Sequence, residues 1–375
     1  MNFKKSAIAI ILTLALLISL CGCLDTGKSS NTPSGGKSDG GADVSAKKNK
    51  DAIITEGDLQ IHFLELGNKY TGDCTYIRAG ENDILIDAGS KVSSVETIDN
   101  YLSKYVEDDT LEYVIVTHAH EDHYAGFATS EKKESLFDLY ECEVIIDFAQ
   151  VEKGKEDKAQ YKNYVRERDA EIEKGATHYT AAQCVEMGGE FDLGNGITFT
   201  VLDSYFYYNR SSSENNHSVC TLFSDGTNSY LFTGDLEAEG EEKLVEMNEL
   251  PKVKLYKAGH HGSKTSSSDA LLDVVTPEIV CVCCCAGSPQ YTDTVENQFP
   301  TQLFINRISK HTDAVYVTTL CEDYENGKFT SMNGNIVVVS IAGEVSVHCS
   351  ASTDKLKDTS WFKKNRTVPD AWKNE

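Results

Sequence analysis

The sequence predicts a mixed α/β or α+β domain, because strand-like and helix-like segments interleave along most of its 375 residues. Short apolar runs such as 111–120 and 278–286 have the length of buried strands. Segments with helical spacing, such as 93–106, stand between such runs. No internal repeat of solenoid length is visible, so we expect one folded body, from residue 55 to residue 350.

The first half of this body has the pattern of several strands and one capped helix. Residues 59–67 and 74–89 are rich in strand-forming side chains, and a polar turn at 79–83 divides the second run. Residues 93–106 repeat apolar side chains at helical spacing after a serine, which favours a helix start. Residues 111–120 are apolar until they reach a group of histidines, as expected of a buried strand.

The second half of the body is irregular at first and then returns to strands. Residues 131–190 mix both patterns, and a very polar helix at 156–175 is expected to face solvent. A helix at 267–277 ends at Pro277. The last residues, 351–375, are polar and predict a tail. Further strands are predicted at 197–205, 218–235, 252–263, 278–286, 314–319 and 334–350.

Residues 278–286, EIVCVCCCA, hold four cysteines, for which two interpretations are open. One is a thiolate metal site, but the run lacks the two-residue gaps of a zinc knuckle. The other is a buried strand, because the run is continuously apolar and cysteine packs as a small hydrophobic side chain. We predict the buried strand.

The formal net charge of −24 limits what the chain can bind. A chain of this charge repels polyanions at long range. A sequence-independent grip on duplex DNA needs many lysines and arginines close to phosphates. The acidic balance therefore disfavours broad nucleic-acid binding, and any such role would need a local positive feature or a metal ion.

The first residues predict export and attachment to a membrane. Residues 1–22 begin MNFKK and continue with fifteen uncharged residues, typical of a signal peptide and short for a spanning helix of about 20 residues. The next letters, LCGC, resemble the lipobox of bacterial lipoproteins, which implies cleavage before Cys23 and a lipid on its thiol. An uncleaved signal anchor is the alternative. Residues 23–54 predict a flexible linker to a lipid on the outer face of the cytoplasmic membrane.

The hexapeptide HAHEDH, residues 118–123, is the clearest chemical signal in the sequence. His118 and His120 alternate at the end of a predicted strand, so both imidazoles can reach one ion. Asp122 and His123 form a second pair that can reach a neighbouring ion. Zinc favours histidine nitrogen and carboxylate oxygen. A solvated surface loop is the alternative, but it poorly explains three histidines and an aspartate at the end of an apolar strand.

These features resemble the metallo-β-lactamase fold family, whose signature is H-x-H-x-D-H after a strand. ILIDAG, YLFTGD and AGHHGSKTSS resemble other motifs of this family, in the same order along the chain. HFLELGN and TGDCTYI resemble the opening of one branch, which holds the C-terminal domain of ComEC-type competence proteins. The resemblance covers residues 58–350, and it implies a four-layer αββα sandwich with metal ions at one edge.

The resemblance also implies which residues bind two metal ions. Asp235, the last residue of YLFTGD, would bridge the ions, and Asp87 of ILIDAG would orient a ligand histidine. The implied ligands are His118 and His120 for the first ion, Asp122 and His123 for the second, and His261, or else its neighbour His260, to complete the second.

Two segments depart from the pattern of this branch. Where the branch shows N-x-x-S, the chain reads ENNHSVC, which places Asn216 and Ser218 beside the candidate ligand His217. A polar loop histidine is the alternative interpretation of His217. After the strand at 278–286 the branch often carries GHP, and this chain lacks that histidine.

The segment HHGSKTSSS adds candidates for catalysis. Lys264 can act as a point charge for a phosphate oxygen, next to Ser263. The free N–H groups at the start of the following helix also favour phosphate. Capping of that helix by residues 266–268 is the alternative, and both can hold together. Asp122, His260 and Lys264 are therefore the predicted catalytic residues.

The predicted site indicates a reaction class. Two ions about 3.5–4 Å apart lower the pKa of a bridging water and clamp an oxyanion between them. We therefore predict a hydrolase with two zinc ions, or with manganese, whose bridging hydroxide cleaves phosphodiesters. Carbonyl substrates, namely β-lactams, lactones or thioesters, are the second enzymatic interpretation. A non-catalytic module in DNA uptake is the third. The sequence does not predict an oligomeric state.

Overall fold

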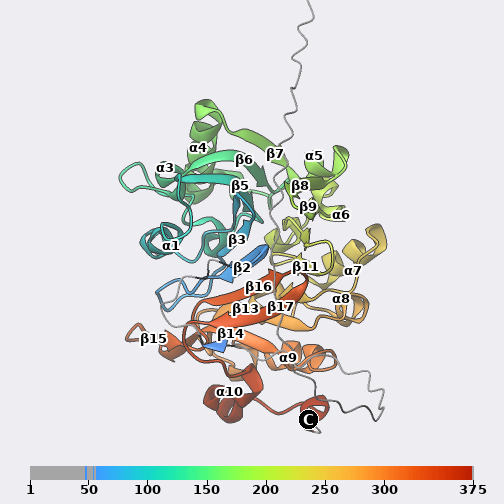
Figure 1. Cartoon of the computed structure of the whole chain (residues 1–375). Helices are drawn as coiled ribbons and strands as arrows, with labels where there is room; N and C mark the ends of the chain where they lie inside the picture. Colours follow the sequence, from blue (N-terminus) through green and yellow to red (C-terminus); the bar gives the residue numbers. More distant parts are fainter. Residues whose placement is uncertain (1–46, 49–53, 55, 374–375) are drawn as a thin grey trace, which may run out of the picture. The chain divides into compact units, whose positions relative to one another are not determined.

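The computed structural model describes residues 47–48, 54 and 56–373. The predicted signal peptide and Cys23 lie outside these residues, as does most of the predicted linker. Two large mixed sheets and the helices packed on them make up the described body (Figure 1). Within the described ranges, none of the helices combines the length and the apolar character needed to cross a bilayer.

Nine strands of the described residues form the first sheet, whose parallel part leads to the histidine motif. β4, β5, β6 and β7 run parallel to one another, whereas β16, β2, β3 and β4 alternate in direction. The short strand β1 lies in the range predicted as a linker and pairs with β17. The order is β1 (Lys47–Lys48), β17 (Glu344–Cys349), β16 (Ile336–Ile341), β2 (Leu59–Phe63), β3 (Thr75–Ala79), β4 (Asn82–Ile86), β5 (Thr110–Val116), β6 (Glu141–Asp147) and β7 (Thr177–Thr180).

The second sheet has eight strands among the described residues and also joins a parallel to an antiparallel part. β11, β12, β13 and β14 are parallel, and the strands at both edges are antiparallel to their neighbours. The order is β15 (Lys328–Ser331), β14 (Val315–Asp323), β13 (Ile279–Ala286), β12 (Leu255–Lys257), β11 (Ser229–Phe232), β10 (Thr221–Ser224), β9 (Ile197–Val201) and β8 (Glu190–Gly194).

The main core lies between the two sheets. Phe63 of β2 stacks on Phe232 of β11 with ring centroids 6.2 Å apart, and Tyr113 of β5 meets Phe199 of β9 at 5.1 Å. Buried side chains from both sheets form one continuous cluster. The apolar faces of the two sheets therefore pack against each other, as in a sandwich.

β13 is buried along its whole length, which confirms the interpretation of the cysteine run as a core strand. Cys281 and Cys283 belong to the core between the sheets, whereas Val280, Val282 and Cys284 face the helices outside. This alternation is the period of a strand that is covered on both faces. Burial also raises the pKa of the Cys281 and Cys283 thiols, which disfavours the thiolate form that binds metals.

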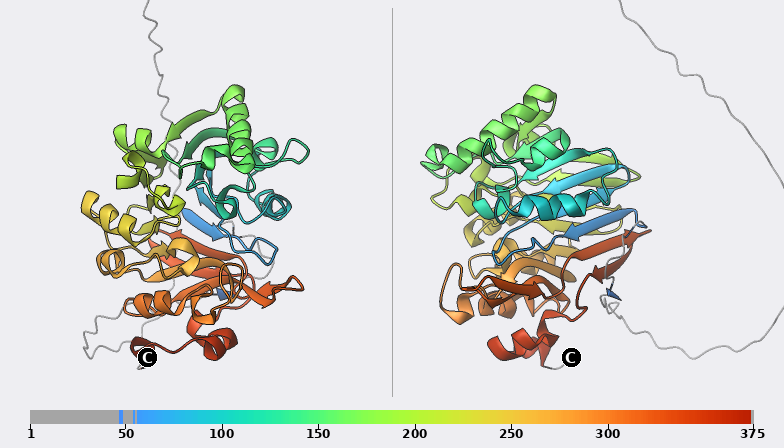
Figure 2. Two further views of the ribbon diagram at one scale, coloured as in Figure 1. Left: turned by 180° about the vertical axis from the view of Figure 1, so that it is seen from behind. Right: turned by 90° about the vertical axis from the view of Figure 1, so that its left-hand side faces the viewer.

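Helices cover the outer face of the second sheet, as Figures 1 and 2 show. Leu244, Leu272 and Phe304 contribute to the buried cluster between these helices and the sheet. The apolar residues of each helix recur at helical spacing, so one stripe of each faces the sheet. The helices are α7 (Ala238–Met247), α8 (Asp269–Val275) and α9 (Gln302–Ile308).

Other helices cover the first sheet and complete the four layers. Ile98 and Leu136 pack from two of these helices into the buried cluster of that sheet. The long helix α4 (Ala159–Lys174) buries only Tyr164 and Glu171, which confirms the prediction of a polar helix that faces solvent. The remaining helices here are α1 (Ser94–Leu102) and α3 (Leu136–Leu139), whereas α5 (Ala181–Glu186) contacts strands of both sheets.

Residues 351–373 fold onto the body, so the prediction of a polar tail is wrong for these residues. Leu356, Trp361, Phe362 and Trp372 are buried in the cluster that covers the second sheet. Two of them stand on α10 (Ser360–Asn365) and the others on short turns beside it. A few large apolar side chains hold the segment in place, although its average composition is polar.

Candidate metal centre

The predicted metal site lies where strands of both sheets end. The hexapeptide 118–123 follows β5 of the first sheet and runs into the short helix α2 (Glu121–Tyr124). Asp235 follows β11 of the second sheet, and His261 follows β12. Loops at the ends of strands hold functional side chains on a rigid scaffold, so this edge is well suited to a site.

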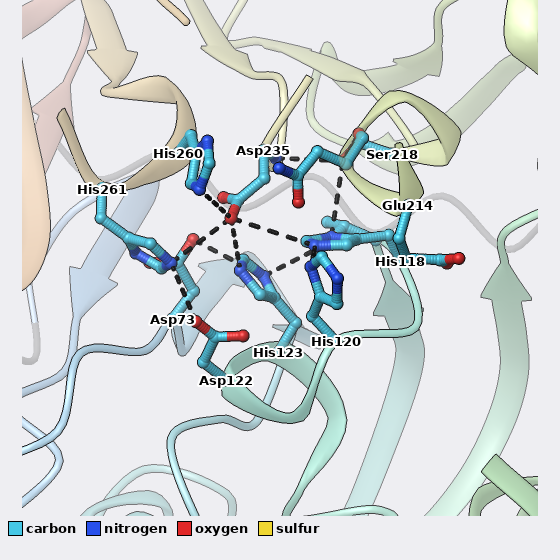
Figure 3. Close-up of polar contacts among 12 residues, drawn as sticks. Asp73, His118, His120, Asp122, His123, Glu214, Ser218, Asp235, His260 and His261 are labelled. Atoms are coloured by element: carbon cyan, nitrogen blue, oxygen red, sulfur yellow. Dashed lines mark hydrogen bonds and ion pairs between the residues drawn. The ribbon is translucent and has the colours of Figure 1, made fainter. Parts of the chain in front are cut away.

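Four imidazoles turn toward one carboxylate oxygen, Oδ2 of Asp235 (Figure 3). This oxygen lies 3.1 Å from Nε2 of His123 and 3.4 Å from Nε2 of His261. Nε2 of His260 and Nε2 of His118 lie 3.8 and 3.9 Å from the same oxygen. The fold thus brings residues from three separate motifs of the sequence together around one aspartate.

His120 and Asp122 extend this cluster on two sides. Nδ1 of His120 lies 3.0 Å from Nε2 of His118. Oδ2 of Asp122 lies 3.5 Å from Nε2 of His261. The candidate ligands therefore form two neighbouring groups that share Asp235.

The atoms at the centre fit a metal ion in type and in burial. Nε2 of His123, Nε2 of His261 and Oδ1 of Asp235 are buried and make no hydrogen bond in the described part of the chain. Buried polar atoms normally find a partner, so converging atoms without one mark a place for a ligand. Four residues each offer one possible ligand atom here, and these atoms lie within 4.8 Å of one another: Asp73, His123, Asp235 and His261. Imidazole nitrogen and carboxylate oxygen are ligands that zinc takes.

Burial and charge act in opposite directions on the central histidines. Burial lowers the pKa of His123 and His261, but Asp235 outweighs it, together with Asp87 at His123 and Asp73 at His261. The pKa of both is therefore raised, to about 10 for His261. Both histidines thus carry protons in the metal-free chain. An ion that binds their Nε2 atoms displaces these protons, so metal binding releases protons.

Asp87 orients His123 from the side away from Asp235. Oδ2 of Asp87 lies 2.7 Å from Nδ1 of His123. Oδ1 of Asp87 accepts the N–H of Thr117 at 2.8 Å, which fixes the carboxylate. With Nδ1 engaged, Nε2 of His123 is left to face the cluster, as the resemblance implied for Asp87.

Asn216 and Ser218 hold the loop that carries Asp235. Oγ of Ser218 accepts the N–H of Asp235 at 3.0 Å and lies 3.4 Å from Nδ1 of His118. Oδ1 of Asn216 accepts the N–H of Glu237 at 3.1 Å. Both side chains therefore support the centre without joining it.

His217 is turned away from the cluster, so its position does not support the predicted role as a ligand. Nε2 of His217 accepts the N–H of Ser211 at 3.0 Å, and Nδ1 lies 3.6 Å from Oε2 of Glu214. Both ring nitrogens thus face the loop that carries them. Glu214 also accepts the N–H of Ala119 at 2.9 Å, so this loop braces the histidine motif from behind.

The two adjacent histidines occupy a strained backbone turn. His260 has φ 47° and His261 has φ 54°, both in the left-handed region that side chains rarely adopt. Nδ1 of His260 lies 2.9 Å from Oγ1 of Thr265, and Nδ1 of His261 lies 2.9 Å from the carbonyl oxygen of Cys283. The turn buries His261 in the cluster and leaves His260 at its edge, 21% exposed. This placement favours His261 as the ligand.

Ser263 and Lys264 lie outside the cluster. Oγ of Ser263 accepts the N–H of Thr265 at 3.2 Å, and Thr265 in turn contacts His260. The side chain of Lys264 is exposed, because the chain turns toward the surface after the buried Gly262. The position of Lys264 therefore does not support the predicted catalytic role.

The start of α8 is already occupied by groups of the protein. Oγ of Ser268 accepts the N–H of Leu271 at 3.4 Å, which confirms the capping interpretation. The carboxylate of Glu241 accepts the N–H groups of Ser267 and Ser268 at 2.6 and 2.7 Å. A phosphate would need these same donors, so phosphate binding at this helix end is not supported.

Glu241 is expected to make the stability of the fold depend on pH. Burial raises its pKa from 4.5 to about 7 despite its hydrogen bonds. The folded chain thus holds a proton that the unfolded chain releases, so this stability is full below pH 4.5 and is lost as pH rises through about 7. The free energy of unfolding should therefore fall by about 3 kcal/mol between these two pH ranges, and Glu241→Gln should abolish this fall.

Urea unfolding at about pH 5 and about pH 7.5 measures this effect. The wild-type chain should lose clearly more stability over this interval than the Glu241→Gln chain. Glu246→Gln, on the exposed face of the same helix, is the matched control and should behave as the wild type. Equal losses in the wild-type and Glu241→Gln chains would contradict the role given to Glu241.

A pocket of about 520 Å³ opens beside the cluster. Tyr291, in the segment after β13, donates its O–H to Oδ2 of Asp122 at 2.6 Å. Lys91 forms an ion pair with Glu121 at the same opening. The lining residues are Ser90, Lys91, His120, Glu121, Asp122, Asp235, His260, Gln290 and Tyr291.

Three residues of the site were not predicted from the sequence, namely Asp73 and Lys257 at the centre and Tyr291 at the opening of the pocket. Asp73 lies in TGDC, a segment that carries the resemblance, but nothing in its spacing connects it to the histidines. Lys257 looks like the polar end of a strand, three residues before His260. Tyr291 lies three residues after Ser288, which stands where the branch often has the histidine of GHP, so the sequence carries no direct signal for Tyr291.

Comparison with known proteins gives the family of this domain. The model of the Metallo-beta-lactamase superfamily matches residues 67–133. Recombination protein 2 of Haemophilus influenzae is 33% identical over 125 residues, which are 33% of this chain and 14% of that protein. Competence protein ComA of Neisseria gonorrhoeae is 32% identical over 145 residues, which are 38% of this chain and 18% of that protein. The chain therefore spans less than a fifth of either relative.

Solved structures also match much of this chain, at low sequence identity. The metallo-beta-lactamase fold protein YhfI from Bacillus subtilis has 10% identity and a TM-score of 0.40, and the match covers 72% of this chain and 98% of that one. The sequence matches agree with the two facing sheets and with the buried cluster of aspartate and histidine side chains. This chain carries a metallo-β-lactamase domain, has the metallo-β-lactamase fold, and is related in sequence to competence proteins.

Proposed function

We propose that this domain is a metal-dependent hydrolase that cleaves phosphodiester bonds with two metal ions, zinc in preference to manganese. The observation that carries the proposal is the convergence of four Nε2 atoms on Oδ2 of Asp235 at the floor of an open pocket. Structural zinc sites are closed, whereas a catalytic site keeps one side open to substrate.

The two neighbouring groups of ligands would each hold one ion. Bound ions would supply Lewis-acid activation of water and of the scissile bond. The chain's own carboxylate, Asp235, lies between the groups and balances the positive charge that they collect. The assigned ligands are His118, His120 and Asp235 for the first ion, and Asp122, His123, His261 and Asp235 for the second.

Three other side chains of the pocket act on the substrate in this proposal. Lys91 provides an ammonium group for a non-bridging phosphate oxygen, in the role first predicted for Lys264. Tyr291 holds Asp122 through its O–H and narrows the opening. His260, fixed at Nδ1 by Thr265, presents Nε2 to the pocket, where it can pass a proton to the leaving oxygen.

The relatives support phosphodiesters over carbonyl substrates. Their names, Recombination protein 2 and Competence protein ComA, refer to recombination and competence, which fit a phosphodiester substrate. Lys91, which is paired with Glu121, is the lysine at the pocket that can donate to a phosphate oxygen in so acidic a chain. Lactones and thioesters without an acidic group would gain nothing comparable from this lysine.

Hydrolysis of bis(4-nitrophenyl) phosphate by the purified chain, with zinc or manganese, tests the proposal. Lys91→Met should raise KM by roughly tenfold, because one charge-assisted contact to the phosphate is lost. Lys264→Met, which removes an exposed lysine nearby, is the matched control and should leave KM unchanged. A purified chain that hydrolyses β-lactams or lactones but no phosphodiester substrate would contradict the proposal.

The placement of the protein in the cell is a further part of the proposal. We infer that the chain is exported and anchored through a lipid on Cys23 to the outer face of the cytoplasmic membrane. Residues 1–23 support this inference, and the competence-protein relatives fit a role at a membrane. Labelling with a radioactive fatty acid that persists in a Cys23→Ser chain would contradict it.

A non-catalytic DNA-binding module remains the alternative of a different class. Relatives named for recombination and competence favour it, whereas the net charge of −24 opposes broad DNA affinity. DNA binding that weakens steeply with salt, in a chain without hydrolytic activity, would favour the module.

A further inference from the structure

We propose that Asp73 and Lys257 form a buried ion pair that positions the metal-binding histidines from behind, and that Asp73 is not itself a metal ligand. The inference rests on the metal site of the proposed function. Asp73 lies in the connection between β2 and β3, and Lys257 is the last residue of β12, so the pair links the two sheets. The two residues are only 1% and 3% exposed, and their side chains are in direct contact.

The carboxylate of Asp73 faces the Nδ1 atoms of His123 and His261, whereas an ion at the cluster would bind their Nε2 atoms. Oδ1 of Asp73 lies 3.1 Å from Nδ1 of His261, and Oδ2 lies 3.7 Å from Nδ1 of His123. The Nε2 atoms of the same rings lie 3.4 and 3.1 Å from Oδ2 of Asp235. An imidazole binds one ion through one nitrogen, and its other N–H is held by a carboxylate or carbonyl. On that side Nδ1 of His123 is also held by Asp87 at 2.7 Å, and Nδ1 of His261 lies 2.9 Å from the carbonyl oxygen of Cys283. Asp73 therefore shares the place of an orienting group with these two acceptors.

Lys257 excludes a metal ion from Asp73 by its charge. Its ammonium group contacts Oδ2 of Asp73, the oxygen nearest His123, and also donates to the carbonyl oxygen of Ala258 at 3.3 Å. A divalent ion on the same oxygen would meet this ammonium group at close range, where charges of one sign repel strongly in a buried place. The lysine thus neutralises Asp73 and leaves Asp235 as the carboxylate that attracts the ions.

The backbone of Asp73 also forms hydrogen bonds to the segments that carry Asp122 and Gly89. Its N–H donates to the carbonyl oxygen of Asp122 at 2.9 Å, and its carbonyl oxygen accepts the N–H of Gly89 at 2.9 Å. Both bonds survive a change of side chain. The substitution Asp73→Asn therefore removes the charge while it keeps the connection between the motifs, which makes the role of the side chain testable.

The experiment uses the full chain and three variants, Asp73→Asn, Lys257→Met and the double variant. Each is stripped with a chelator and titrated with Zn²⁺ and with Co²⁺, which reports its ligands by visible absorption. Thermal unfolding without metal measures stability separately. Arg168→Met is the matched control, because it breaks another ion pair to a buried carboxylate, that of Asp147, away from the cluster.

The double variant should fold, because it leaves no unpaired buried charge, and it should bind Zn²⁺ roughly 10- to 100-fold more weakly, with an altered Co²⁺ spectrum. Lys257→Met alone should also weaken binding, while Arg168→Met should lower only stability. Tighter binding in Lys257→Met would reveal Asp73 as a ligand released from its lysine and overturn the inference. So would wild-type affinity and spectrum in the double variant. A wild-type chain that binds no metal would instead refute the proposed function, and the inference with it.

Discussion

An Asp235→Asn chain is expected to bind less than half the metal of the wild-type chain and to lose hydrolytic activity by roughly a thousandfold or more. Four histidine Nε2 atoms lie between 3.1 and 3.9 Å from Oδ2 of this residue. Asparagine removes the negative charge on which both groups of ligands converge. Its amide also offers N–H donors in a place where metal ligands must be acceptors.

Metal content by mass spectrometry and single-turnover hydrolysis measure the two effects. Asp225→Asn is the matched control, because Asp225 lies in the turn between β10 and β11 and bonds to Tyr230 and Ser340, not to the cluster. It should keep full metal content. If the wild-type and Asp235→Asn chains hold equal amounts of metal, Asp235 does not bridge the ions.

A Gly89→Ala chain is expected to lose about 3 kcal/mol or more of stability and to bind metal poorly. A β-carbon on Gly89 would lie 1.6 Å from the carbonyl oxygen of Asp122 and 2.7 Å from the backbone nitrogen of His123. Both atoms belong to the peptide group between Asp122 and His123, and backbone atoms cannot yield as the tip of a flexible side chain can. The added methyl group must therefore push the second pair of ligands out of position.

Urea unfolding of the metal-free chain measures the loss of stability, and a zinc titration measures the loss of the site. Gly154→Ala is the control, because a β-carbon there meets nothing within 4 Å, although the residue has φ +86°. It should lose only about 1 kcal/mol, from the backbone conformation alone. Similar losses at the two glycines would show that the close approach at Gly89 is unimportant.

The sequence alone was enough to predict those parts of the structure that depend on the order of apolar and polar residues within one segment. Residues 111–120 end in alternating histidines, and the strand β5 brings them to the edge of the sheet as its period requires. The cysteine run is a core strand because both of its faces are apolar. Asp235 and His261 could be assigned only through the family resemblance, since no local pattern relates them to the hexapeptide.

The parts that the sequence could not predict depend on contacts between distant segments. Asp73 and Lys257 meet only because β2, β3 and β12 end at the same edge, and a lone aspartate and a lone lysine carry no signal of that meeting. His217 has the residue type of a ligand, but its loop turns the ring toward Glu214. Residues 351–373 look polar on average, while their burial depends on a few aromatic side chains.

The division of the ligands between two sheets bears on how the protein assembles. The hexapeptide belongs to the first sheet, whereas Asp235 and His261 belong to the second. Neither sheet alone can offer a complete site, so the full set of ligands forms only when the two sheets have docked. Contacts between segments far apart in the chain form slowly. The formation of the complete zinc site in refolding chains therefore reports when the two sheets have docked, and it separates this long-range step from the folding of either sheet.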